Sequence, residues 1–246
     1  MSTVLSSRTQ WAILSRRYRD VVLGDWPTLL LLVGQAPAIG MLCAVVWGTV
    51  DEGTPSLWFV LALAAVWFGC INACREVVKE RAIVERERMF GLSLPAYVGS
   101  KMQVLAGLGL VQVVLLQGAV EWSLSLRGPY LLQTLCLWLG CLAGTSLGLL
   151  VSAIARRQER AVGVVPLLLL PQILFSEFAV PDEHFRGLLE VTRSIMPVHW
   201  SYTVFSAGAA TEPRWNEVAE GLVALPAMTA GLAALAVLAL YRRQEV

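Results

Sequence analysis

Six long apolar segments dominate this 246-residue chain, and each is long enough to cross a lipid bilayer. They cover approximately residues 27–48, 57–74, 97–120, 130–155, 162–178 and 218–240. A span of about 20 apolar residues matches a hydrocarbon core of about 30 Å. We therefore predict an all-α membrane protein with six transmembrane helices, in which residues 1–26 precede a six-span domain at residues 27–246.

Positive charge lies mainly on one side of these predicted spans. Fifteen of the 19 Lys and Arg residues precede span one, separate spans two and three, separate spans four and five, or follow span six. The other side keeps only Arg127, Arg186, Arg193 and Arg214. Because Lys and Arg are retained on the cytoplasmic side of a membrane, both termini are expected to be cytoplasmic.

Composition excludes several classes of protein. The combination of 57% hydrophobic and 15% charged residues is unusual for a soluble domain. The net charge is only +1 and the basic residues alternate with Glu, so we expect no nucleic-acid partner. No P-loop pattern occurs, and no span carries the repeated ionisable residues of an ion-coupled carrier.

No catalytic or metal site is expected in this chain. Its cysteines all lie within or at the ends of predicted spans, at positions Cys43, Cys70, Cys74, Cys136 and Cys141. Cys70 and Cys74 share a helix face but have no accompanying His, so packing is the favoured interpretation. An intramembrane enzyme would need a polar cluster at membrane depth, whereas His184 and His199 lie in the loop before span six.

Residues 8–24 predict an interfacial helix before span one. Trp11, Leu14 and Tyr18 recur at roughly helical spacing among arginines, as in helices that lie in the plane of an anionic membrane surface. The alternative is a disordered basic tail. Asp25-Trp26-Pro27 is expected to turn the chain into span one.

The most densely charged segment, REVVKERAIVERER at residues 75–88, joins spans two and three. We predict one helix there, with ion pairs at Arg81–Glu85 and Glu85–Arg88. A solvated charged helix is one interpretation. Its position directly under the spans favours a contact surface for a protein partner.

Small residues and prolines predict how the later spans pack. Close helix packing is expected at Gly107, Gly109, Gly140, Gly144 and Gly148, of which the last three recur every fourth residue. Span five is interrupted by Pro166 and Pro171. The loop at residues 179–217 is long and partly apolar, so short re-entrant or interfacial helices are expected there.

Three segments resemble the ABC type-2 permeases, particularly their G-subfamily-like branch. RAIVERERMFGLSLPAYVGSK is similar to the cytoplasmic signature of that family, and the matching positions are Arg86, Glu87, Gly91, Tyr97, Ser100 and Lys101. Residues 10–40 resemble the connecting helix and first span of bacterial versions fused to forkhead-associated and ATPase domains. Residues 176–202 resemble the external re-entrant region, with Pro197 and Trp200 at its recurrent positions, although Ser176-Glu177 replaces the usual Ser-Gly.

The resemblance implies a half-transporter in a bacterial inner membrane. Two such chains, in the simplest case identical, would pair around a central pathway among membrane lipids. Each would rest on an ATP-binding subunit or domain, separate or fused, which would hold the ATP and Mg²⁺. This chain itself would hold no cofactor and would not be an enzyme.

Family resemblance also implies roles for particular residues. The coupling helix between spans two and three would contact the ATPase through Glu80, Arg81, Glu85, Arg86, Glu87 and Arg88. The connecting helix would pack beside it through Arg16, Arg17 and Arg19. The translocation path would be lined by Trp67, Phe68, Asn72, Leu169, Gln172 and Phe175, unless these side chains only pack within the bundle or face lipid. Glu177 would be an external gate, or simply a solvated carboxylate.

Two functions remain open at this level. The favoured one is export of a lipid-like or amphipathic substrate by alternating access, because the expected wall of the path is mostly apolar. The alternative is an ATP-driven mechanotransmission or assembly scaffold of the same fold acting on a periplasmic partner. Scaffolds of that kind carry large external domains, whereas the external loop here has about 40 residues.

Overall fold

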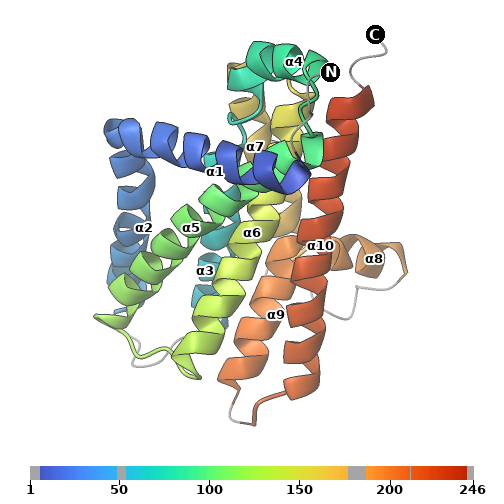
Figure 1. Ribbon diagram of the computed structural model, residues 1–246. Helices are drawn as coiled ribbons and strands as arrows, with labels where there is room; N and C mark the ends of the chain where they lie inside the picture. The colour runs from blue at the N-terminus through green and yellow to red at the C-terminus, as the bar shows by residue number, and fades with distance from the viewer. Residues whose placement is uncertain (1–5, 49–53, 177–186, 211, 243–246) are drawn as a thin grey trace.

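A computed structural model describes residues 6–48, 54–176, 187–210 and 212–242 (Figure 1). The described residues form helices and no strands. The helices are α1 (Ser7–Gly24), α2 (Trp26–Trp47), α3 (Pro55–Ala73), η1 (Val78–Glu80), α4 (Arg81–Met89), α5 (Leu94–Glu121), α6 (Tyr130–Ile154), α7 (Gln158–Leu174), α8 (Leu188–Ser194), α9 (Pro197–Ala209) and α10 (Trp215–Arg242). The expected all-α architecture is therefore confirmed.

Five segments of the described chain are long and apolar enough to cross a membrane. They contain α2, α3, α5, α6 and α10. The predicted span at 162–178 corresponds to α7, which has only 17 residues and begins with the polar sequence Gln158-Glu159-Arg160. Five spans thus follow from length and composition, and the sixth stays a prediction.

The helix α1 lies crosswise to the long helices, at the upper ends of α2 and α5, while α10 continues past it (Figure 1). Its N-cap is Ser6, whose Oγ accepts the backbone N–H of Thr9 at 3.3 Å. The expected turn into the first span is confirmed. The Asp25 carboxylate accepts the Thr28 N–H at 3.4 Å, and Pro27 occupies the first turn of α2, where its missing N–H costs nothing.

The predicted single helix at residues 75–88 is wrong in detail. After α3 ends, the chain makes a turn, then the short 3₁₀ helix η1, and only then α4. Ser152 of α6 explains the break, because its Oγ accepts the backbone N–H groups of Val77 and Val78 at 2.9 and 3.0 Å. Those groups are satisfied by a side chain, so α4 can leave the direction of α3.

Close helix packing is confirmed at Gly109, Gly140, Gly144 and Gly148, but the prediction is wrong for Gly107, where an added Cβ would meet no heavy atom within 4 Å. A Cβ atom added at Gly144 would collide with the Val66 carbonyl oxygen, and one at Gly148 would lie 2.6 Å from the Cys70 carbonyl oxygen. Gly140 instead approaches Ser201 of α9. The glycine repeat therefore brings α6 against α3 with two of its members and against α9 with the third.

The helix α3 is central and α2 is peripheral. Within their apolar segments, 78% of residues are buried for the α3 segment but 17% for α2. The main core forms around α3, α6 and α9, and a second core joins α1 and α5 to the ends of α3, α6 and α10 that lie near α1. In Figure 1, α2 stands at one side of the bundle, beside α5.

Candidate functional site

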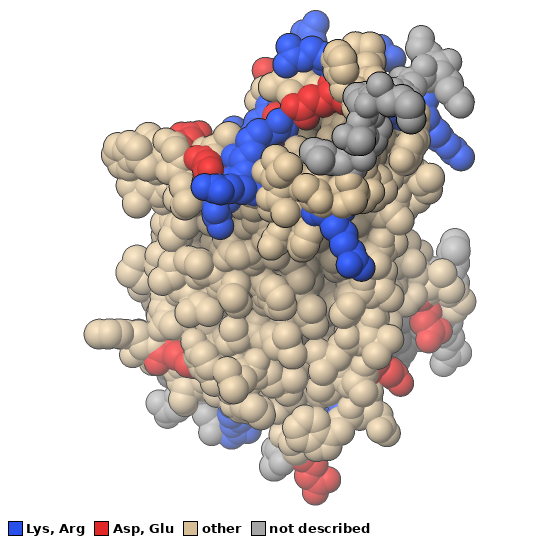
Figure 2. All heavy atoms as spheres, viewed as in Figure 1, with Lys and Arg blue, Asp and Glu red and all other residues tan. Residues whose placement is uncertain are grey.

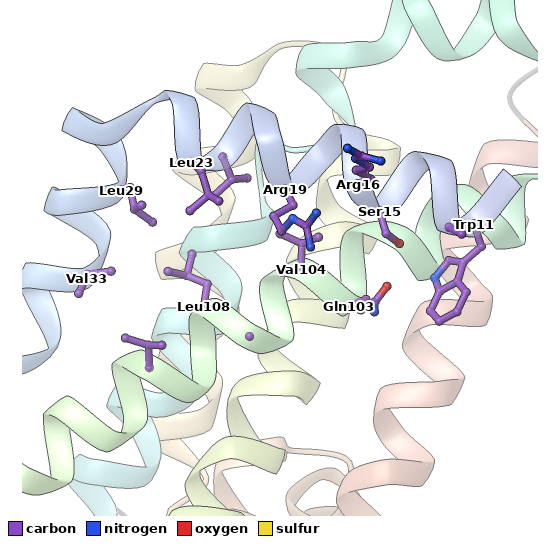
Figure 3. A pocket seen from close by; sticks show the side chains of 14 residues that line it. Trp11, Ser15, Arg16, Arg19, Leu23, Leu29, Val33, Gln103, Val104 and Leu108 are labelled. Carbon is purple, nitrogen blue, oxygen red and sulfur yellow. The ribbon is translucent and has the colours of Figure 1, made fainter. Parts of the chain in front are cut away.

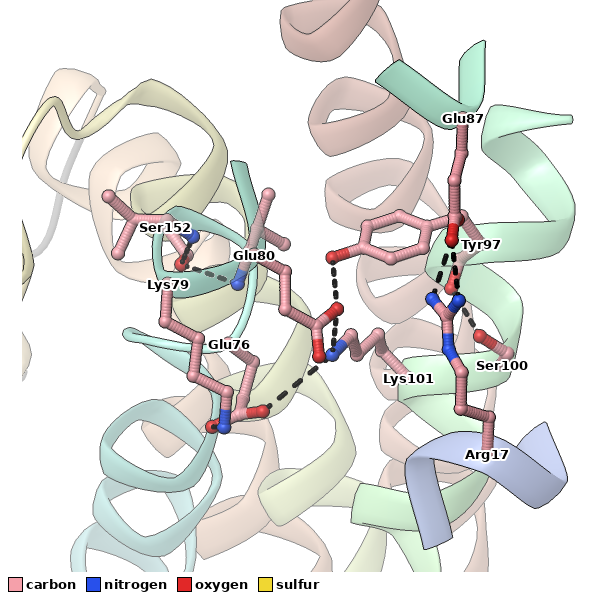
Figure 4. A network of polar contacts seen from close by, with 11 residues as sticks. Arg17, Glu76, Lys79, Glu80, Glu87, Tyr97, Ser100, Lys101 and Ser152 are labelled. Carbon is pink, nitrogen blue, oxygen red and sulfur yellow. Dashed lines mark hydrogen bonds and ion pairs between the residues drawn. The ribbon is translucent and has the colours of Figure 1, made fainter. Parts of the chain in front are cut away.

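Charged side chains gather at one end of the molecule, where α1, η1, α4 and the first turns of α5 meet (Figure 2). We call this the charged end. The middle of the visible face is almost free of charge, and scattered groups of both signs, most of them acidic, reappear at the opposite end. At the charged end a network of ion pairs connects elements distant in sequence (Figure 4). We call it the charged junction, and it consists of Arg17, Tyr18, Glu76, Lys79, Glu80, Glu87, Tyr97 and Lys101.

Lys101 is the centre of the charged junction. Its side chain is only 1% exposed, and its Nζ lies 2.8 Å from Glu80 Oε2 and 3.8 Å from Glu76 Oε2. The ammonium also lies 3.7 Å from the centre of the Tyr18 ring, a cation–π contact. A buried charge needs such compensation, since removing a lone ammonium from water costs several kcal/mol or more.

Further contacts balance the two carboxylates. Glu76 also pairs with Lys79 at 2.6 Å, and the Tyr97 hydroxyl donates to Glu80 Oε2 at 3.1 Å. Two Lys thus face two Glu. Burial, reinforced by the charge of Glu76, raises the pKa of the Tyr18 phenol well above its ordinary value, so this ring stays neutral. The junction therefore joins α1, η1 and α5 without excess charge.

A second connection joins α1 directly to α4. Arg17 Nη1 donates to Glu87 Oε1 at 2.6 Å, and Nη2 donates to Oε2 at 3.4 Å, a two-pronged geometry that fixes orientation as well as distance. The hydrogen bond to Glu87 raises the pKa of Arg17. Gln10 adds a clamp, because it donates to the Gly91 carbonyl at 3.1 Å and accepts the Ser93 N–H at 2.8 Å.

The six predicted coupling residues take different positions. Glu80 and Glu87 turn inward to the charged junction. Arg81 forms the expected pair with Glu85 at 2.8 Å. The expected Glu85–Arg88 pair is wrong, because Arg88 donates to the Leu240 carbonyl at 2.8 Å and lies over the Tyr241 ring of α10.

The remaining side chains of α4 and its C-cap form an exposed face, which we call the outer face and which consists of Ile83, Arg86, Met89 and Phe90. Arg86 is exposed and forms no ion pair within the part of the chain that the structure describes. Beside it Met89 and Phe90 are 79% and 82% exposed, and Ile83 is 42% exposed. Large apolar side chains clustered around a charge are typical of a contact surface.

The three arginines predicted on the connecting helix also separate. Arg17 reaches α4, whereas Arg16 and Arg19 line a cavity between α1, α2 and α5. Their different directions follow from the helical period, which places neighbouring residues about 100° apart around the axis.

The predicted path residues lie deep in the single chain. Phe68, Asn72, Leu169 and Gln172 are buried, and Trp67 and Phe175 are partly buried. Asn72 Nδ2 donates to Gln112 Oε1 at 2.6 Å, and Gln172 Oε1 accepts the Val198 N–H at 3.2 Å. Both polar members thus hold neighbouring helices of the same chain, and their predicted role stays a prediction. Glu177 lies outside the described residues.

Sequence reasoning missed several members of this site. Lys101 was identified only through the family signature, and Tyr18 only as part of an apolar pattern. Glu76, Gln10 and Gln112 were not singled out. An ionisable residue inside an apolar segment is the one signal that could have found Lys101. The described residues contain no group of three metal-ligating side chains, and the five cysteines are buried and unpaired.

Comparison with known proteins agrees with this architecture. The family model for the ABC-2 type transporter matches residues 9–209. An ABC transporter ATP-binding/permease protein of Mycobacterium tuberculosis is 27% identical over 82% of this chain. The chain spans only about a quarter of that relative, since the match covers 25% of its length. The matched region includes the charged junction and all helices from α2 to α9, and this chain belongs to the ABC-2 type transporter family.

Proposed function

We propose that this chain is the transmembrane half of an ATP-driven exporter in a bacterial inner membrane. Membership of the ABC-2 family and the similarity to an ATP-binding/permease protein support a membrane component that works with an ATP-binding partner. That partner would bind ATP and Mg²⁺ and catalyse hydrolysis. The chain described here would convert the partner's movement into movement of the spans.

The observation that carries the proposal is the charged junction beneath the exposed face of α4. Arg86, Met89 and Phe90 face outward and offer a surface for the ATP-binding partner. On the other side of the same helix, Glu87 holds Arg17 of α1. Glu80, immediately before α4, holds Lys101 of α5. A push on α4 would therefore reach two further helices through direct charge contacts.

Space beside α4 supports such a movement. A cavity of about 790 Å³ lies between α4, η1 and α10, and its walls include Val84 and Leu240 together with Arg86 and Met89 of the outer face. Because packed interiors deform little, a helix with open space along this face and an ion pair to α1 on another is suited to rigid-body displacement. This space would allow α4 to move when the ATP-binding partner moves.

Orientation follows from charge. The charged end holds α1, α4 and the last turns of α10, so the described part of the chain both begins and ends there (Figure 1). With Lys and Arg retained in the cytoplasm, this end would face the ATP-binding partner. The sixth span would be α7, and α8 and α9 would form the external re-entrant region.

A second copy of this chain would complete the pathway. One face of α3 is only partly buried and includes Leu63, Trp67 and Ile71, which recur at helical spacing. Exposed apolar residues on α7, including Leu167 and Leu170, offer a further surface. A pathway between two such apolar faces suits a lipid-like or amphipathic cargo moved outward by alternating access.

The test is co-purification of the chain with the ATP-binding subunit or domain that accompanies it, followed by ATPase assays in liposomes. We expect Arg86→Ala/Phe90→Ala to release the partner, because it truncates the outer face of α4. Glu87→Gln should keep the partner bound but lower transport-coupled ATPase activity severalfold. Trp122→Ala, which alters an exposed side chain beyond the far end of α5, is the control. A wild-type chain that binds no ATPase would refute the proposal.

A further inference from the structure

The structure assigns a lipid-binding site to the groove between α1, α2 and α5. We propose that it holds one anionic glycerophospholipid, with the phosphate at Arg16 and Arg19 and an acyl chain along α5. The cavity has a volume of about 660 Å³, within the range of small-molecule sites. This inference needs only a membrane-embedded chain and does not depend on the transport proposal.

The groove is polar at one end only. Arg16, Arg19, Ser15 and Gln103 line it at the level of α1, and Figure 3 shows Ser15 and Arg19 pointing from α1 toward α5. Below them the walls are apolar and continue to Val111. Gln103 and Val111 are about 12 Å apart along the axis of α5, at 1.5 Å per residue. This gradient matches a headgroup above and a hydrocarbon chain below.

The polar groups at the upper end lack adequate partners within the chain. Arg16 forms no ion pair among the described residues, and Arg19 has only its neighbour Asp20, at 3.9 Å. The Oγ of Ser15 is buried without a hydrogen-bond partner in the described structure. A phosphate oxygen or a lipid ester in the groove would supply the missing partner of this hydroxyl. No acidic residue lines the groove.

The groove is accessible from the side of the molecule. Leu23 and Val111, which line it, are 59% and 48% exposed. Because α1 lies crosswise at the ends of α2 and α5, as interfacial helices do, we expect its arginines at the depth of the lipid phosphates. A lipid of the surrounding leaflet can then enter sideways, and two arginines attract an anionic one.

A second cavity along the same two helices sharpens this assignment. It has nearly the same volume, about 650 Å³, and lies toward the other end of α2 and α5. Its walls include Met41, Val114 and Gly118 but no charged residue. Both cavities between α2 and α5 are thus largely apolar, and of these two only the cavity beneath α1 has cationic side chains in its walls. Specific recognition of an anionic headgroup is expected at that one cavity.

Glycines offer a matched pair of variants. A Cβ added at Gly107, in the proposed site, meets no heavy atom within 4 Å, and the same is true at Gly118, in the second cavity. Gly107→Leu would therefore occupy the lipid site, and Gly118→Leu would occupy the uncharged cavity on the same helix. Arg16→Gln/Arg19→Gln removes the headgroup contacts. Arg156→Gln/Arg160→Gln is its charge-matched control, since both residues are exposed and outside the groove.

The experiment is native mass spectrometry of the full chain in mild detergent. Phosphatidylglycerol and phosphatidylethanolamine with identical acyl chains are titrated separately, and glycerol phosphate is tested as a soluble competitor. We expect the wild type and both controls to retain one phosphatidylglycerol preferentially. The double arginine variant should bind it about tenfold or more weakly, and Gly107→Leu should bind neither lipid at this site.

Three outcomes would overturn the assignment. Equal retention of the two lipids by the wild type would show that the headgroup is not recognised. Unchanged binding in the double arginine variant would place the lipid elsewhere, and displacement by glycerol phosphate at equal concentration would identify a soluble anion as the ligand. Thermal midpoints of all variants, measured without added lipid, establish that each remains folded.

Discussion

The seam between α3 and α6 and the charged junction are both buried, but different forces hold them. In the seam, glycines bring backbone against backbone, with Gly69 and Gly144 facing each other across it. In the junction, Lys101 is surrounded by Glu76, Glu80 and the Tyr18 ring. The seam tolerates no added volume, whereas the junction tolerates no unbalanced charge. A rigid centre with an electrostatic connection at one end suits a bundle that moves as a unit.

The largest effect is expected at the seam, for Gly69→Ala. The new Cβ would collide with the Cys141 carbonyl oxygen and lie 2.5 Å from the Thr145 nitrogen, both backbone atoms that cannot rotate away. Overpacking of this kind costs about 3 kcal/mol or more when neighbours cannot relax. We expect little monodisperse protein in detergent by size-exclusion chromatography. Gly118→Ala, whose Cβ has open space, is the control.

If Gly69→Ala gave normal yield and thermal stability, the close approach of α3 and α6 would be wrong. The seam would then resemble an ordinary side-chain interface. The glycine repeat of α6 would need another explanation, such as contact with a second copy of the chain.

Lys101→Met is expected to be the next most damaging substitution. Methionine fills the same space but leaves Glu76 and Glu80 facing each other with fewer cations. Breaking a buried ion pair by removing one partner costs about 3 kcal/mol. The thermal midpoint should fall accordingly, as measured by thermal unfolding in detergent. Lys79→Met, at a more exposed side chain, should have a much smaller effect.

The seam could be predicted from the sequence, whereas the junction could not. The glycine repeat was read correctly because its three members lie on one helix at a fixed spacing, so a local pattern carries the information. The positions of most spans and the Asp25-Pro27 turn were read from local signals too. The network around Lys101 joins residues up to 83 positions apart, as Tyr18 and Lys101 are. No local pattern specifies which carboxylate meets which cation.

The broken helix at residues 75–88 illustrates the same limit. Its composition favours one continuous helix, and the ion pair Arg81–Glu85 was predicted correctly. The break comes from Ser152, which is about 75 residues away and captures two backbone N–H groups. A tertiary contact overrides local propensity here.

Asn72 lies between the two regions and should show an intermediate effect. Asn72→Leu would leave Gln112 Oε1 without its donor, at a cost of about 2 kcal/mol, because Gln112 is fully buried. The double variant Asn72→Leu/Gln112→Leu should regain part of this stability, since it removes both polar partners together. Thermal unfolding of the three variants measures the effect. If the thermal midpoint of the single variant matched that of the wild type, the buried contact with Gln112 would be refuted and Asn72 would face an open pathway.

The smallest effect on stability is expected for the pair Arg17–Glu87. Both side chains are partly exposed, at 43% and 29%, and ion pairs of that kind contribute up to about 1 kcal/mol. A double-mutant cycle of Arg17→Gln and Glu87→Gln, with the exposed Arg8→Gln of α1 as the control, should give a coupling energy in this range. The same variants should nevertheless lower transport-coupled ATPase activity severalfold in the complex, because this pair joins α1 to α4. A contact that transmits movement should contribute little to the free energy of unfolding but strongly affect transport-coupled ATPase activity. Equal small losses in both would make it only a surface ion pair.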